Sequence, residues 1–194
     1  MIESYLRPLY QKLFINPILR ISSLRAIHPN IFTLIALLLG SAILPCLALN
    51  LRVTAFIFLL LSGFLDTLDG SLARARGKSS PKGAAFDIVS DRIVEVAIVL
   101  GLYLVDPTER ALPSLLMLGS ILICVTSFLI VGVFTENSSS KSFHYSPGLI
   151  ERAEAFIFFS AMILIPSAFV MLAYLFSALV LLTALIRTVQ FCSR

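Results

Sequence analysis

The stretch DTLDGSLARARGKSSPKGAAFDIVSD, residues 66–91, decides how this chain folds and what chemistry it can carry. It holds four aspartates, Asp66, Asp69, Asp87 and Asp91, and the segments on either side are among the most apolar in the chain. A carboxylate placed in hydrocarbon costs about 2.5–3.5 kcal/mol. Four without compensation would cost on the order of 10 kcal/mol, which is comparable to the stability of a whole domain. These carboxylates therefore need partners.

The composition is that of an integral membrane protein. Of the 194 residues, 58% are hydrophobic and 13% are charged, whereas soluble domains average about 45–50% apolar and about 25% charged. Apolar runs of about 17–25 residues can cross a bilayer as helices, and the sequence holds six: 31–49, 51–75, 84–105, 111–135, 149–165 and 168–188. We expect the last two, which share one long apolar stretch, to be separated by a turn at Ile165-Pro166-Ser167. The sequence predicts an all-α membrane protein with one domain over 1–194 and six transmembrane helices in 28–194.

The N-terminal segment, 1–27, precedes the first of these runs. Apolar residues recur in it at helical spacing and form one stripe: Ile2, Leu6, Leu9 and Leu13. The stripe stops at Asn16-Pro17, where we expect the helix to end. Since Arg7 and Lys12 lie off the stripe, the pattern predicts an amphipathic helix on the membrane surface. A helix packed on the protein itself fits the pattern equally well.

The distribution of lysine and arginine predicts the orientation in the membrane. With six spans both termini lie on one side, and that side receives twelve basic residues against two on the other, Arg52 and Arg110. The twelve are Arg7, Lys12, Arg20, Arg25, Arg74, Arg76, Lys78, Lys82, Lys141, Arg152, Arg187 and Arg194. Because basic loops stay in the cytoplasm, we expect both termini and the 75–82 loop to be cytoplasmic. The net charge of +4 favours contact with anionic lipid headgroups or phosphorylated substrates. Nucleic acid is excluded as a partner because no basic patch is interleaved with exposed aromatics.

The spacing of the aspartates predicts that they converge. Asp66 and Asp69 are three apart and Asp87 and Asp91 are four apart, so each pair shares a helix face. A short loop near Gly77–Pro81 makes the two helices antiparallel, and residues at equal depth in such a hairpin have a constant index sum. Asp66 plus Asp91 gives 157 and Asp69 plus Asp87 gives 156. Simple solvated charges at helix ends would account for Asp87 alone, because Asp66 and Asp91 lie about two turns inside their spans.

Four converging carboxylates suit hard divalent cations such as Mg²⁺, Mn²⁺ or Ca²⁺. Two such ions would neutralise the cluster and attract a phosphate-bearing substrate, which is the arrangement that assists in-line displacement at phosphorus. The small residues Gly70, Ala73 and Gly83 would let a ligand or a neighbouring helix approach closely. Arg74 could offer a forked donor to phosphate.

The pattern Asp66-x-x-Asp69-Gly70-x-x-Ala73-Arg74, eight residues, then Gly83-x-x-x-Asp87-x-x-x-Asp91 resembles the signature of the CDP-alcohol phosphatidyltransferase family. The segments HPNIFTLIALLLG (28–40) and GLIERAEAFIFF (148–159) are also similar to family segments that open the first and fifth spans. The resemblance therefore covers most of the chain.

The resemblance implies that a small alcohol attacks the lipid-bearing phosphorus of CDP-diacylglycerol and releases CMP, with two Mg²⁺ or Mn²⁺ ions as cofactors. It also assigns residues. Asp66, Asp69 and Asp87 would hold the metals with Asp91 at their edge, and Asp91 would be the general base. Gly70, Ala73, Arg74 and Gly83 would line the CDP site. A homodimer in a bacterial-type inner membrane, with a cytoplasmic active site, is also implied.

The alcohol acceptor is the open part of this prediction. A phosphorylated acceptor needs further basic residues, and Arg152, Lys82 and Lys141 are available. Arg152 matches inositol-phosphate-type members, but these carry arginines after the fourth span, where this chain has SFLIVGVFTENSSSK (127–141). We favour glycerol 3-phosphate, the commoner acceptor, with inositol phosphate as the alternative. Glu95 continues the row of Asp87 and Asp91 and would shape the acceptor site or make a structural hydrogen bond.

Two other classes of function compete. A cation transporter would also carry intramembrane carboxylates, but it would place them at the midplane on broken helices, whereas these lie towards one side. A non-catalytic membrane scaffold of the same family is the other alternative, and the intact signature argues against it.

Overall fold

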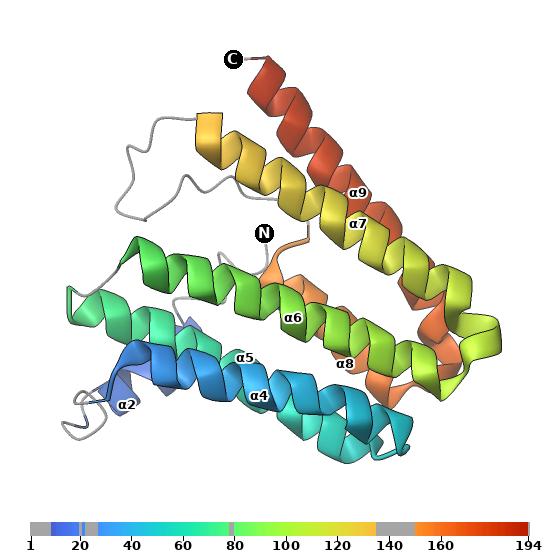
Figure 1. The fold of residues 1–194 in the computed structure, drawn as a ribbon, viewed down its shortest axis with the longest axis horizontal. Coiled ribbons are helices and arrows are strands. Elements are labelled where there is room, and N and C mark those ends of the chain that lie inside the picture. Colours follow the sequence, from blue (N-terminus) through green and yellow to red (C-terminus); the bar gives the residue numbers. More distant parts are fainter. Residues whose placement is uncertain (1–8, 20, 22–26, 78–79, 135–149, 194) are drawn as a thin grey trace. The chain divides into compact units, whose positions relative to one another are not determined.

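The computed structural model describes residues 9–19, 21, 27–77, 80–134 and 150–193, and every regular element in them is a helix (Figure 1). In chain order the elements are η1 (Gln11–Ile15), α2 (Asn16–Leu19), α4 (Pro29–Ala48), α5 (Arg52–Ala75), α6 (Pro81–Val105), α7 (Pro107–Phe134), α8 (Arg152–Leu164), η2 (Pro166–Ala168) and α9 (Phe169–Cys192). Each of the six apolar runs overlaps one of the helices α4, α5, α6, α7, α8 and α9, so the predicted all-α fold is confirmed.

Four helical segments are long and apolar enough to cross a bilayer: α4, α5, α7 and Pro166–Cys192, which joins η2 to α9. The helix α6 has 25 residues, but Asp91, Arg92 and Glu95 interrupt its apolar run. The helix α8 has only 13 residues, which is shorter than a full hydrocarbon crossing requires. Among the described residues, four spans therefore follow from length and composition, which does not confirm the expected six. The chain is an integral membrane protein.

Two compact units divide the chain, one from Ile2–Gly101 and one from Leu102–Arg194. In the first unit α4 packs along α5, and the Ser62 hydroxyl donates to the Ala36 carbonyl at 2.8 Å across that interface. The helix α6 approaches α4 at two glycines. A Cβ on Gly40 would overlap the Val94 side chain, and one on Gly101 would lie 3.0 Å from the Leu44 Cα. Glycine thus brings α6 against α4 at the close distance that small residues permit.

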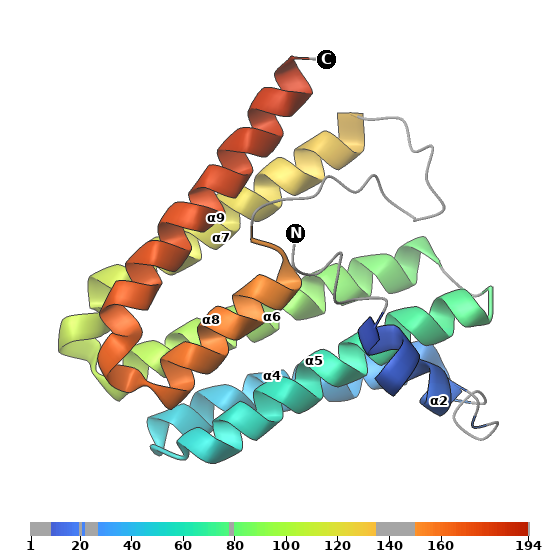
Figure 2. The same ribbon diagram turned by 180° about the vertical axis from the view of Figure 1, so that it is seen from behind.

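The N-terminal helix belongs to this first unit and lies beside α5 (Figure 2). Its Ile15 is completely buried and packs with Phe32 and Leu72. On the other side Leu13 is 57% exposed, so the helix has both a protein-packed face and an apolar face available to lipid. The described part of the predicted stripe, Leu9 and Leu13, belongs to that exposed face, while Ile2 and Leu6 lie outside the described residues.

The expected helix end at Asn16-Pro17 is wrong, because helical backbone continues to Leu19. The turn before the proline is a π-helix, in which the Asn16 N–H bonds to the carbonyl of Gln11. A π turn is wider than an α turn. The wider turn therefore avoids the clash between the Pro17 ring and a backbone carbonyl of the preceding turn that a regular α-helix would cause.

In the second unit α7 packs along α9. The predicted turn is confirmed, since α8 ends at Leu164 and the 3₁₀ turn η2 leads into α9. Arg110 is 6% exposed, and its guanidinium donates to the carbonyls of Leu102 and Pro166, each at 3.0 Å, and lies 4.4 Å from the centre of the Phe169 ring. This arginine therefore ties the start of α7 to the turn before α9.

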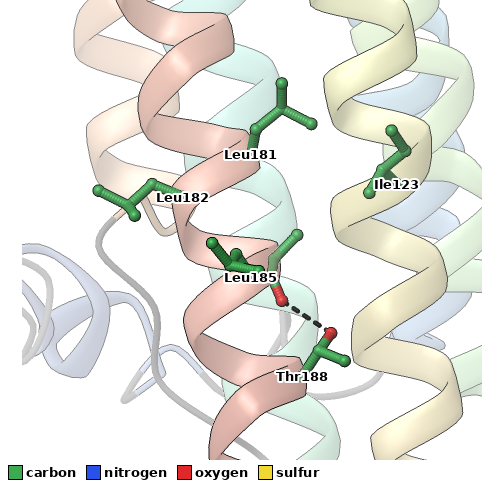
Figure 3. A pocket seen from close by; sticks show the side chains of 6 residues that line it. Ile123, Leu181, Leu182, Leu185 and Thr188 are labelled. Atoms are coloured by element: carbon green, nitrogen blue, oxygen red, sulfur yellow. Dashed lines mark hydrogen bonds between the residues drawn. The ribbon is translucent and has the colours of Figure 1, made fainter.

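A second buried arginine, Arg187 on α9, is 7% exposed. It donates to the Cys124 carbonyl at 3.2 Å and the Ser127 hydroxyl at 3.3 Å on α7. An apolar groove of about 520 Å³ runs along α9 (Figure 3). The groove is lined by Ile123, Leu181, Leu182, Ala184, Leu185 and Thr188. The Thr188 hydroxyl is bonded to the Ala184 carbonyl at 2.9 Å, so the groove suits lipid chains rather than a charged headgroup.

Candidate metal centre and active site

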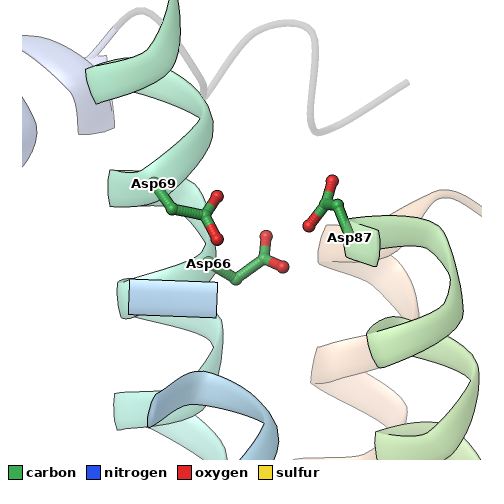
Figure 4. A group of neighbouring side chains, drawn as sticks. All are labelled: Asp66, Asp69 and Asp87. Carbon is green, nitrogen blue, oxygen red and sulfur yellow. The ribbon is translucent and has the colours of Figure 1, made fainter. Parts of the chain in front are cut away.

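Three of the four aspartates converge in the first unit (Figure 4). Asp66 and Asp69 project from α5 and Asp87 from α6, and each offers a carboxylate oxygen within 4.8 Å of the others. Asp66 is 8% exposed and Asp69 is 4% exposed. Buried carboxylates at this separation repel one another, and a divalent cation would offset that repulsion. The all-oxygen donor set fits a hard cation of the kind predicted from the sequence.

The α5–α6 hairpin brings these side chains together through a short turn. The helix α5 ends at Ala75, and Gly77 follows with a φ of +61°, a left-handed conformation that glycine adopts without strain. Its N–H bonds to the Arg74 carbonyl at 3.1 Å. At the start of α6 the Ser80 hydroxyl accepts a bond from the Gly83 N–H at 3.1 Å, and Pro81 occupies the first helical position. Both are strong local signals for a helix start.

Thr33 on α4 is a further residue of the site that the sequence patterns did not identify. Its hydroxyl donates to the Asp69 carboxylate at 2.5 Å, and the threonine is 5% exposed. This bond fixes the orientation of one candidate ligand from a third helix. Thr33 lies in the HPNIFT segment whose family resemblance had been noted, but no spacing rule connects it to Asp69.

Asp91, the fourth aspartate, is not part of the group of three that the described residues form. The structure places its Oδ2 atom 3.8 Å from Nη2 of Arg92. Nη1 of the same arginine lies 2.7 Å from Oε2 of Glu95. A step of four residues turns about 40° around an α-helix. The same step moves about 6 Å along the helix axis, so Asp91 shares a face with Asp87 but lies about one turn further along α6.

The predicted CDP-site residues lie on α5 and α6, the two helices that carry this cluster. A Cβ on Gly70 would lie 3.4 Å from Nη1 of Arg74, so the glycine leaves room for the guanidinium to lie back along α5. Arg74 also donates to the Ser71 hydroxyl at 3.2 Å. A Cβ on Gly83 would lie 3.7 Å from the side-chain oxygen of Asn30, at the start of α4. Ala73 is half-buried on the same helix as Gly70.

The predicted acceptor residues are spread over the chain. Lys82 is exposed at the start of α6 in the first unit. Arg152 begins α8 in the second unit, after a capping box between Glu151 and Glu154, and its guanidinium lies 5.8 Å from the Phe156 ring. Lys141 lies outside the described residues.

Comparison with known proteins identifies the family of the chain. The sequence profile of CDP-alcohol phosphatidyltransferase matches residues 26–190. The chain is 30% identical to Inner membrane protein YnjF of Escherichia coli (strain K12), over 96% of this chain and 93% of that protein. It is also 30% identical to Phosphatidylinositol phosphate synthase of Mycobacteroides abscessus, over 61% of this chain and 55% of that protein.

Solved structures share the fold. The phosphatidylinositol phosphate synthase of Mycobacterium tuberculosis with CDP-DAG bound superposes with a TM-score of 0.72 at 21% identity, over 92% of this chain and 93% of that one. A second structure of the same synthase, in complex with manganese and citrate, also gives a TM-score of 0.72.

The chain belongs to the CDP-alcohol phosphatidyltransferase family. It is a membrane-embedded transferase of phospholipid biosynthesis, which confirms the resemblance read from Asp66 to Asp91.

Proposed function

We propose that this chain transfers a phosphatidyl group from CDP-diacylglycerol to a phosphorylated small alcohol, with release of CMP. The observation that carries the proposal is the group formed by Asp66, Asp69 and Asp87 inside a family match that spans both helices of the hairpin. A related synthase of the same fold has been solved with CDP-DAG and with manganese. The donor's acyl chains would stay in the bilayer while its CDP head reaches the carboxylates.

The three aspartates would hold two divalent ions, Mg²⁺ or Mn²⁺, with Asp91 at their edge. Bound there, such ions would stabilise the negative charge that develops at phosphorus and on the leaving CMP. Thr33 would keep Asp69 in its binding orientation, as outer hydrogen bonds do for metal ligands generally. Gly70, Ala73, Arg74 and Gly83 would line the cytidine and diphosphate site.

Asp91 would take the proton from the acceptor hydroxyl as that oxygen attacks the lipid-bearing phosphorus. A general base must lie within hydrogen-bond reach of the proton it removes. A carboxylate that lies beside the three metal-binding aspartates, rather than among them, is not one of the main metal ligands and so suits the role of a base. The new phosphodiester forms as the bond between the two phosphates breaks.

We propose inositol phosphate as the acceptor. The related synthases are named for acceptors of that class. Arg152, which the sequence resemblance assigns to inositol-phosphate-type members, begins α8. Glycerol 3-phosphate, which the sequence had favoured, has no such support among these relatives. Arg152, Lys82 and Lys141 would bind the acceptor's phosphate.

We further propose that α6 and α8 complete six membrane-crossing helices in one domain. Charged α6 would cross with its carboxylates at the cytoplasmic end, and the twelve-to-two distribution of basic residues would keep both termini in the cytoplasm. A homodimer is expected from the family.

The test is CMP release by the purified protein with CDP-diacylglycerol and Mg²⁺ or Mn²⁺. Parallel reactions contain inositol 1-phosphate, glycerol 3-phosphate, inositol, serine or no acceptor. Asp87→Asn should abolish release, while Asp106→Asn, at a helix cap outside the cluster, should not. Stimulation by inositol 1-phosphate alone supports the proposal, and stimulation by glycerol 3-phosphate alone corrects the acceptor. No release under any condition refutes the transfer reaction, and metal-ion uptake into vesicles by the same protein would support the transporter.

A further inference from the structure

The arginine next to Asp91 forms a three-residue charge arrangement on α6. Nη1 of Arg92 lies 2.7 Å from Oε2 of Glu95, and its Nη2 lies 3.8 Å from Oδ2 of Asp91. The Arg92 side chain is 35% exposed, whereas those of Asp91 and Glu95 are 21% and 20% exposed. One guanidinium therefore contacts two mostly buried carboxylates.

The helix geometry makes the contact with Asp91 unusual. Residues three apart on a helix are neighbours, so the pair of Arg92 and Glu95 is the ordinary arrangement. Adjacent residues point about 100° apart and do not normally meet. Glu95, three residues further along α6, holds one end of the guanidinium at Nη1, and Nη2 of the same group lies 3.8 Å from Oδ2 of Asp91. Glu95 thus acts as the anchor of the arginine, and Asp91 is the group that the anchored arginine restrains.

The neighbouring carboxylates on α6 make a positive charge at Arg92 favourable. Asp87, Asp91 and Glu95 follow one another at four-residue steps, a spacing at which like charges destabilise a helix. Of the basic residues beside the turn, Arg76 directs Nη1 to the Ile27 carbonyl at 2.9 Å and Arg74 donates to the Ser71 hydroxyl at 3.2 Å. Arg92 supplies a positive charge beside Asp91 and Glu95, the last two carboxylates of this row. Its guanidinium lies beside Asp91, which is not among the three clustered aspartates.

We propose that Arg92 is the positioning residue of Asp91: held by Glu95, it keeps the Asp91 carboxylate outside the metal-binding group and available to the acceptor hydroxyl. This inference rests on the proposed function, because it assumes that Asp91 is the general base. It assigns Glu95 the role of anchor, in place of the two roles considered from the sequence. In this role Arg92 would act through Asp91, not by contact with substrate or metal.

The experiment compares Arg92→Met, Arg92→Lys, Glu95→Gln and the double variant Arg92→Met/Glu95→Gln, with Arg52→Met as the matched control. Arg52 is an exposed arginine at the start of α5. For each protein we would measure kcat, KM for donor and acceptor, the Mn²⁺ concentration at half-maximal rate, Mn²⁺ binding by electron paramagnetic resonance, and the unfolding temperature in detergent.

Arg92→Met should lower kcat by about tenfold to a hundredfold, the usual effect of displacing a reacting group by about 1 Å. KM for the donor, Mn²⁺ binding and the unfolding temperature should stay close to the wild-type values. Arg92→Lys should recover part of the loss, because an ammonium carries the charge but cannot reach both carboxylates as a fork does. Glu95→Gln should lower kcat less than Arg92→Met, and the double variant should be no slower than Arg92→Met. Arg52→Met should behave as wild type.

A wild-type kcat in Arg92→Met would overturn the inference while leaving the proposed function intact. Equal losses of kcat, Mn²⁺ binding and stability, without recovery in Arg92→Lys, would show a purely structural arginine and would also overturn it. Absence of CMP release from the wild-type protein itself would instead overturn the proposed function, and the inference with it.

Discussion

Replacing Thr33 by valine removes one hydrogen bond from the candidate metal centre and almost nothing else. Valine has nearly the shape of threonine, and the position is 5% exposed on α4. The lost bond is the one from the Thr33 hydroxyl to the Asp69 carboxylate, which is itself 4% exposed. The substitution therefore tests whether the orientation of Asp69 matters for metal binding.

The expected effect follows from the type of bond. A hydrogen bond to a charged group contributes about 1.5–3 kcal/mol. Each 1.4 kcal/mol is about a factor of ten in an equilibrium constant. If most of this energy serves to hold Asp69 in its binding orientation, Mn²⁺ should bind roughly tenfold to a hundredfold more weakly, the range found for outer-shell partners of metal ligands.

The assay is a Mn²⁺ titration of CMP release by Thr33→Val, with Thr33→Ser as the control that keeps the hydroxyl. Thr33→Val should need more Mn²⁺ for half-maximal rate and reach a similar rate at saturation, and Thr33→Ser should stay near wild type. Unchanged Mn²⁺ dependence in a folded Thr33→Val protein would refute the reasoning, because Asp69 would then not depend on this bond or would not bind metal.

Three further predictions concern stability and membrane contact. Arg110→Ala should lower the free energy of unfolding by about 3–5 kcal/mol, because two charge-assisted hydrogen bonds and the contact with Phe169 are lost; a thermal unfolding midpoint in detergent close to that of the wild type would contradict this. Gly101→Ala should lower the free energy of unfolding by about 1–3 kcal/mol, since its Cβ would lie 3.0 Å from the Leu44 backbone. Gly119→Ala, whose Cβ would have nothing within 4 Å, should leave stability unchanged or raise it slightly. Equal thermal unfolding midpoints for the two variants would argue against the close approach of α4 and α6. The chain has no tryptophan, so Leu13→Trp provides a single fluorophore on the exposed face of the N-terminal helix, and its emission should be blue-shifted and quenched by brominated lipids in vesicles; emission typical of water would exclude the membrane-surface position.

Much of the fold could be predicted because membrane spans are encoded by long apolar runs, a signal that requires no knowledge of packing. The turn at Pro166 could be placed for the same reason, since a proline divides a stretch too long for one span. The continuation of the N-terminal helix past Pro17 could not, because it depends on a π turn that leaves no mark in the apolar pattern. The sequence predicted α6 as a span over 84–105, but the charged residues near its start weaken its transmembrane signal and it is not among the four helices apolar enough to cross.

The aspartate cluster could be predicted from spacing alone, since hairpin geometry fixes which residues of two helices lie at equal depth. Spacing could not predict that Asp91 lies outside the cluster, because depth in the hairpin does not determine the direction of a side chain. Asp91 lies near the Arg92 guanidinium instead. Thr33 was missed because its partner lies 36 positions away, on another helix. Gly40 and Gly101 were beyond prediction for a similar reason, since small residues are common in membrane helices and only the structure shows which ones another helix approaches.

The central claim is that Asp66, Asp69 and Asp87 together hold divalent cations. The most direct test is the amount of Mn²⁺ bound per purified protein chain, measured from the loss of the free Mn²⁺ signal in electron paramagnetic resonance. The wild-type protein should bind Mn²⁺ saturably, and Asp66→Asn, Asp69→Asn and Asp87→Asn should each bind less or far more weakly, while Asp106→Asn should match the wild type. Undiminished Mn²⁺ binding by all three cluster variants, each still folded, would contradict the account.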